Sequence, residues 1–108
     1  MTIYRVLVVC AAGMSSSLLE GKAKKAACVK NHELQIHALS VAEIGLFDFS
    51  CHPVDMVLIA PQVRYKKRSI AEKTAPLGIV VEDIEPMVFG MVDGEKLFEQ
   101  IQRAVKKE

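Results

Sequence analysis

Cys10 is the side chain best placed to act as a nucleophile, because it ends an apolar run and precedes a loop of small and hydroxyl-bearing residues. Free backbone amides in such a loop, and in the first turn of the helix expected after it, can hold a tetrahedral oxyanion. Gly13 permits a close approach that a side chain would block. This positive environment is expected to lower the pKa of the Cys10 thiol and favour the thiolate. The predicted oxyanion-binding residues are Ala11, Ala12, Gly13, Met14, Ser15, Ser16 and Ser17.

The alternative for Cys10 is a purely structural role. Free cysteine is often a small buried hydrophobe, and the serines could serve only as a helix N-cap. The position of Cys10 at the end of a strand, directly before a Gly/Ser turn, favours the functional interpretation.

Helix and strand patterns alternate along the chain. Residues 3–9 form an almost uninterrupted apolar run rich in β-branched residues, which is typical of a strand buried on both faces of a parallel sheet. A helix is expected from the serines to about Lys30, and Asp93 can cap the last helix. The apolar stretch 84–92 is expected to close the core, with an exposed docking patch as the alternative. Further strands are predicted at 34–39, 54–60 and 79–81, and further helices at 41–46 and 64–74.

This order predicts an α/β three-layer sandwich, with a four-stranded parallel sheet in the order 2-1-3-4 flanked by helices. Such a sheet has a switch point between its first and third strands, and ligands bind beyond the carboxyl ends of the strands there. Cys10 and Pro61-Gln62 stand at those two ends. Gln62 is expected to flank the cleft and Tyr65 to line it. The alternatives are a turn that ends the strand for Gln62, and packing on one side of its helix for Tyr65.

Composition narrows the classes of function. The 108 residues fit a single domain over 1–108, and a hydrophobic share of 51% excludes a disordered chain. A net charge of +1 argues against nucleic-acid binding. No apolar run approaches the roughly 20 residues that span a bilayer, so we expect a soluble chain without direct membrane insertion. We also expect a monomer in the cytoplasm. The three cysteines lack CxxC spacing and leave one unpaired in any disulfide scheme, which indicates a reducing compartment.

Three motifs stand in order along the chain: VVCAAGMSSSLL at 8–19, APQVRY at 60–65 and FGMVDG at 89–94. The first resembles the phosphocysteine loop of IIB components in the lactose/cellobiose/chitobiose class of bacterial sugar phosphotransferase systems. The other two resemble segments of the same family, and the resemblance covers essentially the whole chain. The implied fold is also similar to that of low-molecular-weight tyrosine phosphatases.

The resemblance implies a phosphotransferase that works through a phosphocysteine. Cys10 would accept a phosphoryl group from a phosphohistidine of a IIA protein and pass it to a sugar held by the membrane IIC component during uptake. The implied sugar is a β-linked disaccharide such as cellobiose, chitobiose or lactose. No cofactor is implied, and no metal site is expected because His32, His37 and His52 are scattered without ligand spacing.

Two alternatives differ in chemistry or in purpose. Phosphatases and arsenate reductases of this type carry a loop arginine that clamps the phosphoryl oxygens, and Ser16 occupies that position here. They also need a carboxylic acid, for which Asp83 and Glu85 are the candidates. The missing arginine disfavours hydrolysis. A IIB-like regulatory module that senses phosphorylation stays open, because its phosphorylated loop would look the same.

A basic run follows the third strand. Arg64, Lys66, Lys67 and Arg68 form either a solvated helix face or a basic rim that steers an acidic IIA surface. Cys28 and Cys51 lack an activating loop, so neither is a candidate nucleophile.

Overall fold

Four parallel strands form one sheet in the order β2-β1-β3-β4, which confirms the predicted topology. The computed structural model describes residues 2–11 and 17–105. β1 pairs with β2 along its whole length and with β3 over Val6–Val9. The strands are β1 (Thr2–Cys10), β2 (His32–Ser40), β3 (Met56–Ile59) and β4 (Val80–Asp83).

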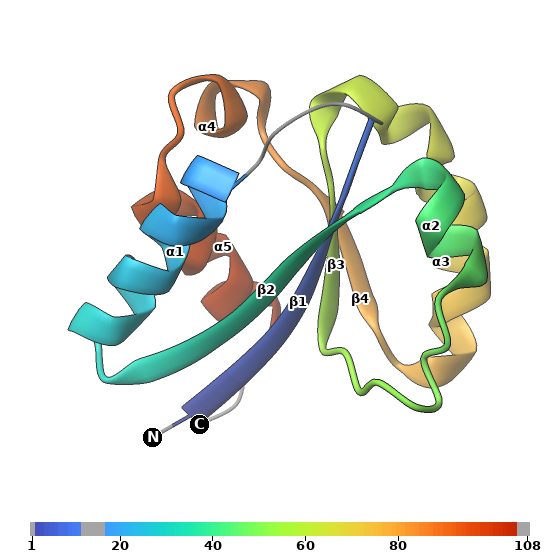
Figure 1. The fold of residues 1–108 in the computed structure, drawn as a ribbon, viewed down its shortest axis with the longest axis horizontal. Coiled ribbons are helices and arrows are strands. Elements are labelled where there is room, and N and C mark those ends of the chain that lie inside the picture. Colours follow the sequence, from blue (N-terminus) through green and yellow to red (C-terminus); the bar gives the residue numbers. More distant parts are fainter. Residues whose placement is uncertain (1, 12–16, 106–108) are drawn as a thin grey trace.

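Helices cover both faces of the sheet (Figure 1). One face carries α1 (Ser17–Val29), α4 (Pro86–Gly90) and α5 (Gly94–Ala104). The other carries α2 (Val41–Leu46), α3 (Lys67–Thr74) and the short 3₁₀ turns η1 (Pro61–Lys66) and η2 (Ala75–Leu77). The three layers are those that the alternating pattern predicts.

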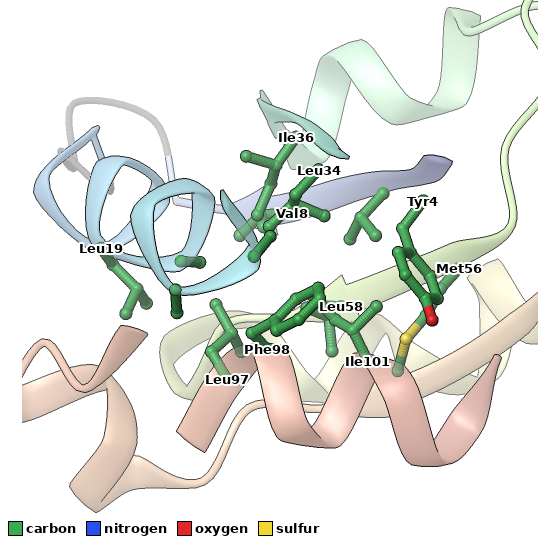
Figure 2. Packing of buried hydrophobic residues seen from close by; sticks show 14 of the residues in the cluster. Tyr4, Val8, Leu19, Leu34, Ile36, Met56, Leu58, Leu97, Phe98 and Ile101 are labelled. Carbon is green, nitrogen blue, oxygen red and sulfur yellow. The ribbon is translucent and has the colours of Figure 1, made fainter. Parts of the chain in front are cut away.

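Alternation along the central strands divides the buried side chains between two cores. Tyr4, Val6 and Val8 of β1 pack with Met56 and Leu58 of β3 in the core beneath α1 and α5. Leu7 and Val9 of β1 pack with Val57 and Ile59 of β3 in the second core, beneath α2 and α3. Figure 2 shows the first core, in which side chains of the sheet meet Leu19 of α1 and the apolar face of α5. From Val6 to Cys10 every residue of β1 is therefore buried in one core or the other.

Caps define two of the helices. The Asp93 side chain accepts a hydrogen bond from the Lys96 amide at 3.1 Å, so the predicted cap of the last helix is confirmed. Ser40 caps α2 through a capping box, in which Ser40 and Glu43 each accept a hydrogen bond from the other's backbone amide.

Beyond shifts of one or two residues at the ends of other strands, the structure differs from the prediction at three places. The helix expected over 64–74 is α-helical only from Lys67, because Pro61 opens a 3₁₀ turn and Val63 has a non-helical backbone. The third strand, expected over 54–60, is shorter. α4 was not predicted, since five residues are too few to show a helical period. Its Val88 and the preceding Ile84 are buried, so this stretch helps to close the core, while Met87 is 70% exposed.

The FGMVDG motif makes a tight connection between α4 and α5. Val92 adopts a positive φ of 53°, which is unusual for a β-branched residue. Gly94, the first residue of α5, is buried against α1, and a Cβ built on it would lie 2.5 Å from the backbone nitrogen of Ala23. The absence of a side chain at Gly94 therefore lets α5 and α1 approach closely.

We predict that Gly94→Ala lowers the free energy of unfolding by about 1–3 kcal/mol, because the added methyl overlaps the backbone of α1 and forces the two helices apart. Chemical denaturation measures the change.

Gly21→Ala is the matched control. Gly21 lies on the exposed side of α1 with open space around its Cα, so the substitution should stabilise by roughly 0.5–1 kcal/mol through helix propensity. Equal effects of the two substitutions would contradict the close-packing argument.

Candidate functional site

Cys10 is the last residue of β1, at the edge of the sheet where β3 also ends. It pairs with Ser40 of β2, and the Ala60 amide after β3 donates to the Val9 carbonyl at 2.9 Å. The amino end of α1 lies at the same edge (Figure 1). The topology thus places Cys10 at the switch point between β1 and β3, where ligands bind in doubly wound sheets.

The Cys10 thiol is in an environment that favours its neutral form. The residue is only 5% exposed and packs in the second core. Its Sγ donates a hydrogen bond to the Leu39 carbonyl at 3.6 Å. Burial raises the pKa of the Cys10 thiol, and the negative charges of Glu20 and Glu43 raise this pKa further. The predicted lowering of the pKa is therefore wrong, because the sequence pattern ignores how deeply the strand end is buried and which charges lie near it.

The predicted oxyanion-binding loop is described only at its two ends. Ala11 is half-buried beside the second core, and Ser17 is the first residue of α1. The role assigned to these residues stays a prediction, and the remaining ones, Ala12, Gly13, Met14, Ser15 and Ser16, lie outside the described residues.

η1 carries the residues predicted across the cleft. Pro61 follows the end of β3, and the buried Val63 holds the turn against the second core. The side chain of Gln62 is exposed, and Tyr65 is 73% exposed, so neither packs in the core. Both are accessible to a partner at the edge where Cys10 lies, and their roles stay predictions.

The basic run is divided between ion pairs and exposed cations. Lys67 Nζ lies 3.3 Å from Asp83 Oδ2, and Arg68 Nε lies 3.5 Å from Glu72 Oε1 on the surface of α3. Arg64 and Lys66 have exposed side chains. Asp83, one of the two carboxylic acids considered for a hydrolase, is thus paired with Lys67.

Other candidate ligands lie apart. Within residues 2–11 and 17–105, no group of three or more His, Cys, Asp or Glu side chains could hold a metal ion. Cys28, Cys51, His37 and His52 are exposed. None of the helices in this described part is long and apolar enough to cross a membrane.

Comparison with known proteins assigns the family. Residues 5–100 match the family model described as "PTS system, Lactose/Cellobiose specific IIB subunit". The chain belongs to this IIB family. It is therefore a phosphocarrier of the phosphotransferase system. Membership of the IIB family implies IIA and IIC partners. The family match favours a IIB component over the phosphatase alternative.

Individual relatives agree with the family. The galactose-specific and cellobiose-specific EIIB components of two Lactococcus lactis strains are each 35% identical to this IIB chain, over 85% of its length and 87% of theirs. The oligo-beta-mannoside-specific EIIB component of Bacillus subtilis is 34% identical over 89% of this chain and 90% of its own.

Solved structures agree as well. The cellobiose-specific IIB component of Borrelia burgdorferi matches with a TM-score of 0.72 and 34% identity, over 95% of this chain and 92% of that one. The lactose-specific IIB domain of Streptococcus pneumoniae has a TM-score of 0.79 at 19% identity, over 97% of this chain and all of that one, which shows a shared fold.

The structure adds three groups that the sequence-based site omitted: the Leu39 carbonyl, Glu20 and Glu43. Glu43 had a signal, because Ser40-Val41-Ala42-Glu43 has the capping-box spacing. No sequence signal indicated that Glu43 lies near Cys10, because this proximity depends on the pairing of β2 with β1.

We predict that Cys10 is alkylated by iodoacetamide on the order of tenfold or more slowly than Cys28 and Cys51 near neutral pH, because it is buried and its raised pKa reduces the thiolate fraction. Its rate should still rise above pH 9.0, the usual value of a cysteine pKa. Intact-mass analysis follows the three adducts. In Cys10→Ala only the slowly formed adduct should disappear. Loss of a rapidly formed adduct would contradict the assignment of slow alkylation to Cys10.

Proposed function

We propose that Cys10 accepts a phosphoryl group from a phosphohistidine of a IIA protein and passes it to a sugar held by a membrane IIC component. The observation that carries the proposal is the position of Cys10, at the carboxyl end of the central strand and at the switch point of a IIB chain. Membership of the IIB family also supports a cytoplasmic location.

Two displacements at phosphorus make up the proposed cycle. In the first, the S–P bond to Cys10 forms as the P–N bond to the donor imidazole breaks, and the thiol proton passes to the departing nitrogen. In the second, a sugar hydroxyl oxygen attacks the phosphorus, the S–P bond breaks, and the hydroxyl proton returns to the sulfur. The amides and hydroxyls of residues 11–17 would hold the phosphoryl oxygens, and Gln62 would flank them.

The absence of the loop arginine suits a carrier. Arginine would stabilise the charge of a hydrolytic transition state, and a positioned acid would activate water. Ser16 replaces the arginine, and Asp83 pairs with Lys67. The thiophosphate is therefore expected to persist until its acceptor arrives.

We propose a β-linked disaccharide as the transported sugar, on the basis of the lactose/cellobiose class of the family. The relatives are specific for galactose, cellobiose and oligo-beta-mannoside, so members of this family serve several different sugars. Selection among them belongs to the IIC component that binds the sugar.

Phosphoryl labelling tests the site. Incubation with phosphoenolpyruvate, the general phosphotransferase proteins and a matching IIA should add one phosphoryl group, which intact-mass analysis detects. Cys10→Ser and Cys10→Ala should lose this group, whereas Cys28→Ser and Cys51→Ser should keep it. Labelling that persists in both Cys10 variants would exclude Cys10 as the acceptor.

Transfer onward separates a transport component from a regulator. Membrane vesicles that contain the IIC component should discharge the labelled protein and form a sugar phosphate. Labelled protein that keeps its phosphoryl group in the presence of IIC and sugar would favour the phosphorylation-sensing module.

The exposed cations of η1 are proposed to steer the IIA protein. Arg64→Gln with Lys66→Gln should slow phosphorylation by about three- to tenfold at low salt, and the difference should shrink at high salt because ions screen the attraction. Phosphoryl labelling quenched at set times, over a series of salt concentrations, measures the rates.

Lys30→Gln with Arg103→Gln is the control pair. Both residues are exposed and come at the ends of α1 and α5, away from the edge that carries Cys10. The same slowing in both double variants would mean that net charge alone matters and would overturn the role of η1.

A further inference from the structure

The pairing of β2 with β1 brings the start of α2 beside Cys10. Ser40 is the register partner of Cys10, and the Cα atoms of such partners lie roughly 5 Å apart. Ser40 is also the N-cap residue of α2. The first turn of α2 therefore begins on the strand adjacent to the nucleophile.

The Glu43 carboxylate is fixed in place by the capping box. Glu43 Oε1 accepts a hydrogen bond from the Ser40 amide at 2.9 Å, and the Glu43 amide donates to Ser40 Oγ at 3.2 Å. Hydrogen bonding of the carboxylate first to the Ser40 backbone amide and then to the Ser40 side chain lowers the pKa of Glu43. A negative charge is thus held against the backbone of the residue that pairs with Cys10.

The other groups around the thiol add to the same effect. The Leu39 carbonyl accepts the S–H hydrogen bond, and Glu20 contributes a second negative charge from α1. η1 contributes Arg64 and Lys66, whose side chains are exposed. Among the described residues, those whose charges act on the thiol are the two carboxylates, and both disfavour a negative charge on sulfur.

We propose that Glu43 is a positioning residue of the phosphotransfer, which adds to burial and Glu20 in favouring the protonated thiol of Cys10 before transfer and weakens the hold of the site on the phosphoryl group afterwards. This inference rests on the proposed function of Cys10. Before transfer, the thiol keeps its proton until the donor imidazole leaves, so that the proton passes to that nitrogen and the IIB chain needs no base of its own. After transfer, the phosphoryl group places a charge of about −1.5 to −2 near a fixed carboxylate, and like charges repel.

The repulsion has a use in a carrier. A group that must move from the donor to the sulfur and then to a sugar should not be bound too tightly on the way. A fixed carboxylate raises the free energy of the phosphorylated form relative to the free thiol. It therefore favours passage to the sugar.

Glu43→Gln tests the proposal, because glutamine also serves at this position of a capping box and the helix keeps its cap. In a background with Cys28→Ser and Cys51→Ser, the pKa of Cys10 should fall, as measured by thiolate absorbance against pH. Alkylation of Cys10 near neutral pH should become about two- to fivefold faster at low salt, and less so at high salt. Glu20→Gln should act in the same direction.

Two control variants separate charge from structure. Glu33→Gln removes an exposed carboxylate near the other end of β2, and should leave the Cys10 titration unchanged. Glu43→Ala removes the charge and the hydrogen bond from the Ser40 amide to the Glu43 side chain, whereas the backbone amide of residue 43 can still donate to Ser40 Oγ. A thiol pKa that shifts in Glu43→Ala but not in Glu43→Gln would show that only the hydrogen bond to the Ser40 amide matters and would overturn the proposal.

The phosphorylated state gives the second measurement. At equilibrium with phosphorylated IIA, the ratio of phosphorylated to unphosphorylated protein should be about two- to fivefold higher for Glu43→Gln than for the native chain, because the repulsion is gone. An unchanged or lower ratio would overturn this half of the proposal. The thiol titration uses no phosphoryl donor, so its failure is distinguishable from a failure of Cys10 to be labelled.

Discussion

The parallel pairing of β1 with a strand on each side is the constraint on which the rest of the structure depends. It buries β1 on both faces, so its side chains alternate between two cores and helices must cover both faces of the sheet. From Val6 onward every side chain of β1 is buried. Cys10 is the residue at which the strand leaves the sheet, and it is thus the first position where the chain can present chemistry to a ligand. The same pairing brings the ends of β2 and β3 beside it.

This arrangement has an electrostatic consequence. The burial that makes β1 the centre of the fold also removes the Cys10 thiol from water, and the start of α2 adds a fixed carboxylate next to it. A hydrolase would be expected to surround the thiol with cations that stabilise the thiolate. A carrier has a different requirement, because it must accept a group from one protein and release it to another. A neutral resting thiol with carboxylates nearby meets that requirement without a loop arginine.

The FGMVDG motif shows how a family resemblance can reside in structural residues. Val92 turns the chain with a positive φ, Asp93 caps α5, and Gly94 lets α5 pack directly on the backbone of α1. None of these residues needs to touch a phosphoryl group. Their contribution is to fix α1, whose first turn lies at the edge of the sheet with Cys10 (Figure 1).

Local rules were enough to predict the class of fold and the position of Cys10, because a buried parallel strand, a helix cap and a proline each leave a pattern in neighbouring residues. The strand order followed from the general topology of doubly wound sheets. Local rules also indicated the Asp93 cap. They did not predict α4, which is too short to show a period, or the kink at Val63. The sequence by itself thus determined which residue is the nucleophile candidate. Only the tertiary structure decided its protonation, because burial depends on the packed core and the charges of Glu20 and Glu43 are brought near Cys10 by the fold, Glu43 through the pairing of β2 with β1.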